Sequence, residues 1–515
     1  MLPGRNRIFR RREGSDALSL RGKKHTPGEE RRAAGDLRAR SRYPAGILQR
    51  SGLWGWCAFL ALFCTMVTYP GIWYSDSYVR VTTAYAVMNS VKITLAGHPA
   101  PLYTGNAFTV IPSFMMGLSL LATGHVALYT FCQAFGFFAA VFLLIRELDP
   151  PFPKAVCVLF AVSPVIYGAS VYYEANVGSL IGLILLILLF RRCGEEPRPA
   201  GRVLEFILIA LSSLITFGYR TNALTVLPVL IFCLFRSARR RRAKKLPALC
   251  ALLFGIALTW LIPRAFQVIG ESNAGTGLVW EILTTIQRMD EPSQAAYLDY
   301  LDDIGGEGAT LAALRSSTED SVDNFMWGTP LNPETLSAPG AFSRVVGKYL
   351  RLILEKPGDW LRVKADFVAK ALGLPAPLDL YEYPYNRWDR MEAYGMTDSR
   401  QRTLFHASVI RENELLQFFT CRPWIAFLIS GALLLIETLR GSKKRALYAL
   451  LFWLAVFYYL AYLIMIVVFQ QRMFYPSLLL LLSLDACVTS EWISALISAV
   501  RSVIPERRSR HASRG

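Results

Sequence analysis

Long apolar segments constrain this chain more than any other feature of its sequence. Each is roughly 17 to 25 residues long, the length with which a helix crosses a hydrocarbon core of about 30 Å. One such segment could be a signal sequence, but about ten of them occur. With 53% hydrophobic residues in 515, the sequence predicts an all-α polytopic membrane protein with about 10 to 11 transmembrane helices.

The positive charge is concentrated in both tails and one loop. The net charge is +18; residues 1–50 hold 14 Lys/Arg against 5 acids, residues 236–245 hold 7 against none, and residues 501–515 hold 5 against 1. Short basic segments of this kind mark the cytoplasmic side of membrane proteins. Residues 1–50 could also form an arm for nucleic acid or anionic lipid. Topogenic charge is the simpler interpretation, so no nucleic-acid partner is expected.

Cysteine and histidine spacing predicts neither a disulfide framework nor a zinc site. The nine cysteines lie mostly inside apolar segments and form no CxxC pair, as expected of core-filling side chains. The five histidines show no HxxxH spacing, so no metal ligands are assigned.

Hydropathy and charge divide the sequence into five predicted regions. They are a disordered basic cytoplasmic tail (1–50), a transmembrane module with the first outer loop (51–268), an extracytoplasmic amphipathic region (269–421), C-terminal transmembrane helices (422–490) and a basic cytoplasmic tail (491–515). No cleavable signal peptide is predicted. Its absence, together with the lack of a disulfide pattern, favours a bacterial cytoplasmic membrane.

Ten spans are predicted, and basic loops give their direction. The spans lie near 52–74, 125–145, 154–172, 175–192, 203–219, 221–236, 247–268, 423–439, 446–469 and 473–488. The loops 191–202, 236–245 and 440–445 and the C-terminus are basic, and this order of helices after residue 175 puts all four in the cytoplasm.

A further apolar block, 104–122, contains Asn106 and Pro112. If residue 75 is outside and residue 191 inside, an odd number of blocks must cross between them, so we expect this block to lie along the outer face or dip into it. Asp76 and Glu174 then share the outer face. In the alternative, 104–122 spans while another block is short, and the two carboxylates lie on opposite sides.

The only large hydrophilic region is 269–421, with 22 acids and 14 Lys/Arg. Its segment 343–372 alternates apolar and basic residues at helical spacing. This pattern predicts amphipathic helices on the outer membrane surface or packed on the bundle, rather than an independent β domain.

Two carboxylates lie where predicted spans meet the outer face. Asp76 follows the first span in YPGIWYSDSYVR, and Glu174 opens another in SPVIYGASVYYEAN. Carboxylates at such a rim can divide acid and base roles or hold a cation. The alternative is structural, because Asp76 is a good helix N-cap and Glu174 is favourable at a helix N-terminus.

Two arginines lie in tight outer turns. Arg220 belongs to TFGYRTNALTV and Arg472 to FQQRMFYPSLLL. A guanidinium matches phosphate oxygens, so the pair predicts an anionic lipid head group, with Asn222 and Tyr475 as hydrogen-bonding companions. The alternative is snorkelling of both side chains to the interface.

Two further sites are weaker. His98 lies in GHPAPLY, where prolines favour an extended loop; it could contact substrate or be a structural histidine. Asp379, Glu382 and Tyr383 cluster acids and aromatics as sugar-binding loops do, but exposed amphipathic loops have the same composition.

The order of these motifs over residues 52–240 resembles the membrane-embedded C-type glycosyltransferases that use polyprenyl-phosphate sugars, in particular the protein-mannosyltransferase and aminoarabinose-transferase branch. The similarity rests on an early acid in the first loop, GHPAPLY, and a second acid after an SP-containing span. The segment RMFYP near 472 adds an Arg-Tyr-Pro-like pattern.

The resemblance implies transfer of a sugar from a polyprenyl-phosphate carrier to an extracytoplasmic acceptor. Asp76 corresponds to the first-loop catalytic carboxylate and Glu174 to the second acid, whereas Arg220 and Arg472 are candidates for the donor phosphate. Relatives often show two acids in the first loop where this chain has one, so use of a divalent cation stays open. The competing class is a transporter or flippase for a lipid or anion, which needs polar residues in mid-membrane.

Overall fold

The computed structural model describes residues 51–67, 80–89, 102–103, 110–163, 174–192, 199–237, 245–266, 268–269, 275–318, 321–326, 328–379 and 413–503. The chain divides into two units, Met1–Trp56 and Cys57–Gly515. The arrangement below is that of the second unit.

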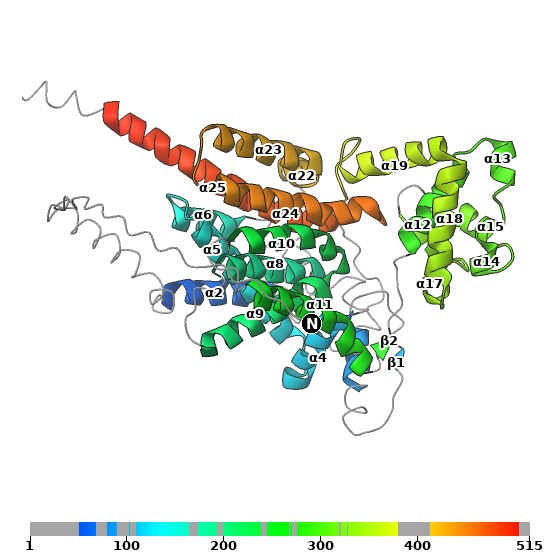
Figure 1. Ribbon diagram of the computed structural model, residues 1–515, viewed down its shortest axis with the longest axis horizontal. Coiled ribbons are helices and arrows are strands. Elements are labelled where there is room, and N and C mark those ends of the chain that lie inside the picture. The colour runs from blue at the N-terminus through cyan, green and yellow to red at the C-terminus, as the bar shows by residue number, and fades with distance from the viewer. Residues whose placement is uncertain are drawn as a thin grey trace, which may run out of the picture. The chain divides into compact units, whose positions relative to one another are not determined.

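Apolar helices make up most of the described chain (Figure 1). The first group is α2 (Ser51–Val67), a helix at 80–89, α4 (Val110–Thr123), α5 (Ala127–Leu148), α6 (Pro153–Val162), α8 (Glu174–Arg192), α9 (Pro199–Tyr219), the 3-10 helix η1 (Thr221–Val226), α10 (Leu227–Ser237) and α11 (Lys245–Ala265). The second group is α22 (Glu414–Thr420), α23 (Pro423–Leu439), α24 (Arg445–Ile464) and α25 (Gln471–Val503).

The chain is a helical membrane protein. Six described helices are long and apolar enough to cross a membrane, namely α5, α8, α9, α11, α24 and α25, and the pair α22 and α23, bent by 68°, would make a seventh span. The apolar helices at 52–66, 110–123, 153–162 and 221–236 are shorter. The predicted count of 10 to 11 spans is therefore not confirmed and stays a prediction.

Close backbone packing joins α8 to α9. A Cβ atom on Gly182 would lie 2.6 Å from the Thr216 backbone nitrogen and 2.7 Å from the Ser212 carbonyl oxygen. The Ser179 hydroxyl donates to the Thr216 carbonyl oxygen at 2.8 Å. Small residues let helix backbones approach in this way when lipid removes the hydrophobic drive for association.

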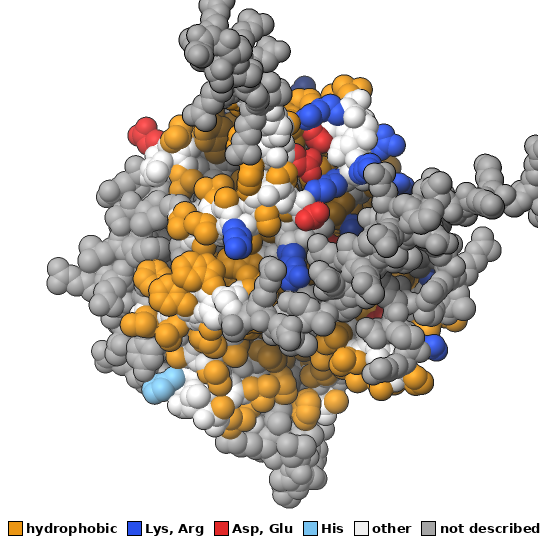
Figure 2. All heavy atoms as spheres, turned by 90° about the vertical axis from the view of Figure 1, so that its left-hand side faces the viewer, with side chains coloured by type: hydrophobic (Ala, Val, Ile, Leu, Met, Phe, Trp, Pro, Cys, Tyr) orange, Lys and Arg blue, Asp and Glu red, His pale blue; other side chains and the backbone are white. Residues whose placement is uncertain are grey.

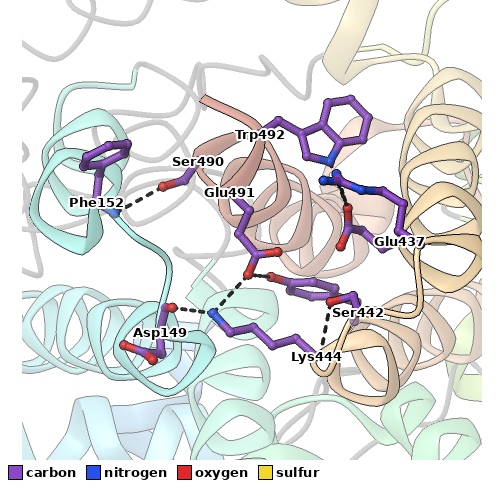
Figure 3. A network of polar contacts seen from close by, with 10 residues as sticks. Asp149, Phe152, Glu437, Ser442, Lys444, Ser490, Glu491 and Trp492 are labelled. Atoms are coloured by element: carbon purple, nitrogen blue, oxygen red, sulfur yellow. Dashed lines mark hydrogen bonds and ion pairs between the residues drawn. The ribbon is translucent and has the colours of Figure 1, made fainter. Parts of the chain in front are cut away.

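One end of the bundle, which we call the basic end, collects the loops predicted to be cytoplasmic. Glu147 at the end of α5 pairs with Arg191 and Arg192 at the end of α8, at 2.7 and 3.3 Å. In Figure 3, Lys444 between α23 and α24 bonds the Asp149 carbonyl oxygen and lies 3.0 Å from Glu491 on α25. These contacts bring the 146–154 and 440–445 loops and the end of α8 at Arg191 and Arg192 to one end of the bundle.

A second set of contacts closes the basic end. Glu437 accepts hydrogen bonds from Trp492 at 2.8 Å and Arg440 at 3.1 Å (Figure 3). Figure 2 looks from the left-hand side of Figure 1, where α25 ends, and shows charged side chains gathered in one part of this face and hydrophobic ones over most of its other described surface. The acids at the basic end thus have cationic partners, and these pairs hold neighbouring loops together.

The described part of the block at 104–122 belongs to α4, which starts at Val110. Ile111 near its start and Met116 in its middle pack in one cluster with Val126, Tyr129 and Tyr219. The start of α4 therefore lies near the C-terminus of α9. That this block does not cross the membrane stays a prediction.

The hydrophilic region contains α12 (Thr276–Gln287), α13 (Glu291–Ala295), α14 (Asp302–Gly305), α15 (Ala309–Ser316), α16 (Asp323–Met326), α17 (Pro333–Ser337), α18 (Ala341–Glu355) and α19 (Pro357–Ala371). Its buried core includes Trp280, whose ring centroid lies 4.4 Å from that of Phe367 and 5.5 Å from that of Phe469. Phe469 belongs to the α24–α25 connection, so the region packs on the bundle. Strand structure among the described residues is limited to β1 (Leu102–Tyr103) and β2 (Val268–Ile269) plus isolated bridges.

We expect Gly182→Ala to lower the thermal-denaturation midpoint of the purified protein, because overpacking a tight contact costs about 1–3 kcal/mol. Gly136→Ala is the matched control, since its added methyl group would meet only Ile181 side-chain atoms at 3.5 Å or more. That control should leave the midpoint unchanged or raise it, because Ala favours a helix over Gly by about 0.5–1 kcal/mol. Equal midpoints for the two variants would contradict the close α8–α9 approach.

Candidate functional site

The helix starts that carry Glu174 and Arg472 meet at the end of the bundle opposite the basic end. α8 begins at Glu174, and the Asn176 side-chain amide in its first turn donates to the Arg472 carbonyl oxygen at 2.6 Å. Arg472 is the second residue of α25. The structure therefore brings these two predicted positions to adjoining helix ends, which we call the site end. The side chain of Glu174 lies outside the described residues.

Arg220 reaches the same end from α9. It follows the last residue of α9 in an extended conformation (φ −144°, ψ 111°), and η1 begins directly after it. The Thr225 hydroxyl of η1 donates to the Phe457 carbonyl oxygen of α24 at 2.6 Å. The Arg220 turn consequently lies against the last turns of α24.

The segments that carry both arginines lie against the C-terminal half of α24. The turn after Arg220 bonds the Phe457 carbonyl oxygen, and Phe474, two residues after Arg472, packs its ring against that of Tyr459 with centroids 5.1 Å apart. Two guanidinium groups at one end of a helix bundle create a positive potential, which low-dielectric surroundings strengthen. Such a place stabilises an anion with several oxygens.

Hydrogen bonds of buried hydroxyl groups link three helices near the arginines. The Tyr458 hydroxyl donates to the Ser179 oxygen at 3.0 Å, and Ser179 donates onward to the Thr216 carbonyl oxygen. All three residues are buried. This network fixes the relative position of α8, α9 and α24 beneath the site.

The loop predicted to be the first outer loop also reaches the site end. Val81 and Ala84 of the helix at 80–89 pack in the same cluster as Tyr219, the residue before Arg220. Tyr103, from the GHPAPLY motif, lies in β1, which pairs in parallel with β2 after α11. The described parts of this loop therefore contact the residue before Arg220 and the segment after α11.

Arg80 is a buried cation that the sequence reasoning missed. Its exposed fraction is 1% although it opens an outer-loop helix. Burial of a guanidinium requires compensating partners. The signal was present in the sequence, because Arg80 follows Asp76 by four residues in the motif singled out for that acid.

The hydrophilic region is attached to the site end through a buried ion pair. Lys364 on α19 lies 2.6 Å from the fully buried Glu281 carboxylate and donates to the Ile464 carbonyl oxygen at 2.9 Å. Tyr349 donates to the same carboxylate. Burial, and next the Glu281 charge, raise the pKa of Tyr349, so its hydroxyl keeps its proton and stays a donor. The end of α24 is thus held by Lys364, which is in turn fixed by Glu281 of α12 and, through it, by Tyr349 of α18.

The other predicted site residues have mixed outcomes. Asn222 lies in η1 with its side chain exposed, and Tyr475 is buried in α25. Asp76 and His98 lie outside the described residues. The structure therefore leaves their predicted roles as predictions.

Asp379 takes part in backbone pairing. Its backbone nitrogen donates to the Phe469 carbonyl oxygen at 3.0 Å, and its own carbonyl oxygen accepts from the Gln471 nitrogen at 2.9 Å. These bonds hold the segment that leads into Arg472. Glu382 and Tyr383, its companions in sequence, lie outside the described residues.

Asp485 is a second ionisable residue that the sequence reasoning missed. It lies in α25 within LLLLLSLDACV, and one carboxylate oxygen accepts from the fully buried Ser430 hydroxyl of α23 at 2.9 Å. The other oxygen is buried and has no hydrogen-bond partner among the described residues. A carboxyl group inside a membrane bundle marks a functional hypothesis by default.

Among the described residues, no group of three or more His, Cys, Asp or Glu side chains could hold a metal ion. Comparisons with family models, with curated proteins and with solved structures found no match to this chain.

Labelling of single cysteines tests whether the two ends face opposite sides of a membrane. Asn222 and Lys443 are exposed at the site end and the basic end, respectively. In a cysteine-depleted background on intact cells, we expect a membrane-impermeant thiol reagent to label Asn222→Cys directly and Lys443→Cys only after permeabilisation, because the basic end should be cytoplasmic. Labelling of both without permeabilisation would contradict the predicted topology.

Proposed function

We propose that this protein is an integral membrane glycosyltransferase that moves a sugar from a polyprenyl-phosphate carrier to an acceptor on the extracytoplasmic face. The acceptor class is a cell-envelope glycan, lipid or protein. The observation that carries the proposal is that the Arg220 turn and the helix start at Arg472 lie at the same end of α24, beside the helix start at Glu174. The motif resemblance supports the same reading, and the spanning helices form the rest of a C-type fold of 10 to 11 spans.

The roles follow from the chemistry of the transfer. The leaving group is a lipid phosphate, on which negative charge develops as the bond to the sugar breaks. Arg220 and Arg472 stabilise that charge, with Asn222 and Tyr475 as hydrogen-bonding neighbours. Asp76 accepts the acceptor's proton or orients its nucleophile, and Glu174 assists as the second acid. His98 contacts the substrate or assists proton transfer. Any divalent cation would bind near the carboxylates.

Transfer by purified protein in lipid nanodiscs, with a radiolabelled polyprenyl-phosphate sugar, tests this function. Asp76→Asn should lower the rate by about 10²–10⁴, the usual contribution of a general base. Arg472→Gln should lower it by about 10²–10³, because a charge-stabilising donor is lost. Lys443→Ala at the exposed basic end is the control and should retain the wild-type rate. Unchanged transfer by Asp76→Asn would overturn the assignment.

The second candidate function is transport or flipping of a lipid or anion, and Asp485 favours it. A buried carboxylate bonded to Ser430 between α23 and α25 is the type of mid-membrane group that coupled transporters use. If the protein transports, Asp485→Asn should abolish movement of the intact lipid phosphate across proteoliposomes, without any covalent product. If the protein is a transferase, Asp485→Asn should leave sugar transfer within a few-fold of wild type.

A further inference from the structure

Three tyrosines in the last turns of α24 differ in how their hydroxyl groups are satisfied. Tyr458, Tyr459 and Tyr462 are all buried, with exposed fractions of 4, 1 and 3%. Tyr458 donates to Ser179, and Tyr459 donates to the Ala371 carbonyl oxygen. The Tyr462 hydroxyl is buried and has no hydrogen-bond partner among the described residues.

Packing alone does not explain a tyrosine at position 462. Its ring packs against Tyr459 with centroids 5.3 Å apart, a contact that phenylalanine would make equally well. A buried hydroxyl left unsatisfied destabilises the folded state by about 1–3 kcal/mol relative to a paired one. The hydroxyl is therefore able to donate to a group that enters the site.

The surroundings of this hydroxyl indicate the charge of that ligand. Tyr459, whose ring packs against that of Tyr462, also packs against Phe474 of α25, two residues after Arg472, with centroids 5.1 Å apart. Guanidinium groups only donate hydrogen bonds, and a neutral tyrosine hydroxyl beside a cation is best used as a donor too. A ligand that accepts from both must carry several negative oxygens, as a phosphate group does.

We propose that Tyr462 is a binding residue for the phosphate group of the lipid carrier, donating its hydroxyl hydrogen bond to the anion that Arg472 attracts. This inference rests on the proposed function and adds a residue that sequence motifs do not reveal. It distinguishes Tyr462 from Tyr459, whose hydroxyl is structural.

The test measures binding to the purified full-length protein in detergent, read from the shift of the thermal-denaturation midpoint. The probes are farnesyl phosphate, farnesol and inorganic phosphate. Wild-type protein should be stabilised by farnesyl phosphate and not by farnesol. Tyr462→Phe should keep or raise the midpoint without ligand and bind farnesyl phosphate about 10- to 100-fold more weakly, as expected for loss of a hydrogen bond to a charged group.

Two matched variants separate binding from folding. Tyr459→Phe should lower the midpoint without ligand, because it removes a satisfied buried bond. Tyr448→Phe, at the basic end beside Glu491, should bind farnesyl phosphate as wild type does. A midpoint for Tyr462→Phe that falls as far as that of Tyr459→Phe would overturn the inference, since the hydroxyl would then have a structural partner.

The remaining outcomes distinguish this inference from the proposed function. If wild type binds farnesyl phosphate and Tyr462→Phe binds it equally well, the role of Tyr462 is wrong and the carrier site stands. If wild type binds inorganic phosphate as tightly as farnesyl phosphate, and Tyr462→Phe loses both, the residue binds phosphate but the lipid carrier is wrong. If wild type binds none of the probes, both the carrier site and the role of Tyr462 are overturned.

Discussion

The position of the candidate site depends on how the backbone between α24 and α25 is held. This connection leaves helical geometry after Ile464 and resumes it at Gln471, so its polar groups need partners from elsewhere in the chain. The hydrophilic region supplies them. Lys364, Val322 and Asp379 donate hydrogen bonds to the carbonyl oxygens of Ile464, Val467 and Phe469, respectively. Unpaired backbone groups next to hydrocarbon would cost several kcal/mol each. Arg472 follows directly, and its placement is a consequence of this pairing.

Hydropathy predicted the helices whose ends coincide with a change of polarity. The span at 175–192 corresponds to α8 within one residue, because Arg191 and Arg192 end the apolar run. The prediction of 446–469 continued five residues past Ile464, since the connection is as apolar as a helix and is buried by pairing. α25 continues to Val503, beyond the predicted end at 488. Its later residues are less apolar, but none before Pro505 breaks a helix.

The charged residues of the candidate site could be predicted from the sequence, but the contacts around them could not. Arg220 and Arg472 were identified because arginine is conspicuous between apolar runs. The approach of their segments to one end of α24 depends on how η1 and α25 pack on that helix, which sequence periodicity does not give among so many buried aromatics. Asp485 escaped notice because one acid in a run of leucines hardly changes the average hydropathy of the span. Tyr459 and Tyr462 are the same type of residue and differ only in the hydrogen-bond partners of their hydroxyl groups.

The place of Asp485 along α25 separates the two candidate functions physically. At 1.5 Å per residue, it lies about 20 Å along the helix from Arg472 and about 9 Å from Glu491 in the basic-end network. A sugar transferase completes its chemistry at the site end and makes no use of a carboxyl group at that depth. A transporter needs a path that connects both ends, and a group that changes its charge along the path would be part of it. The bond from Ser430 holds Asp485 between α23 and α25, where such a path would require these two helices to separate. Binding of a phosphate group by the two arginines needs no such movement. Sugar transfer at a fixed site is therefore the simpler function for this bundle.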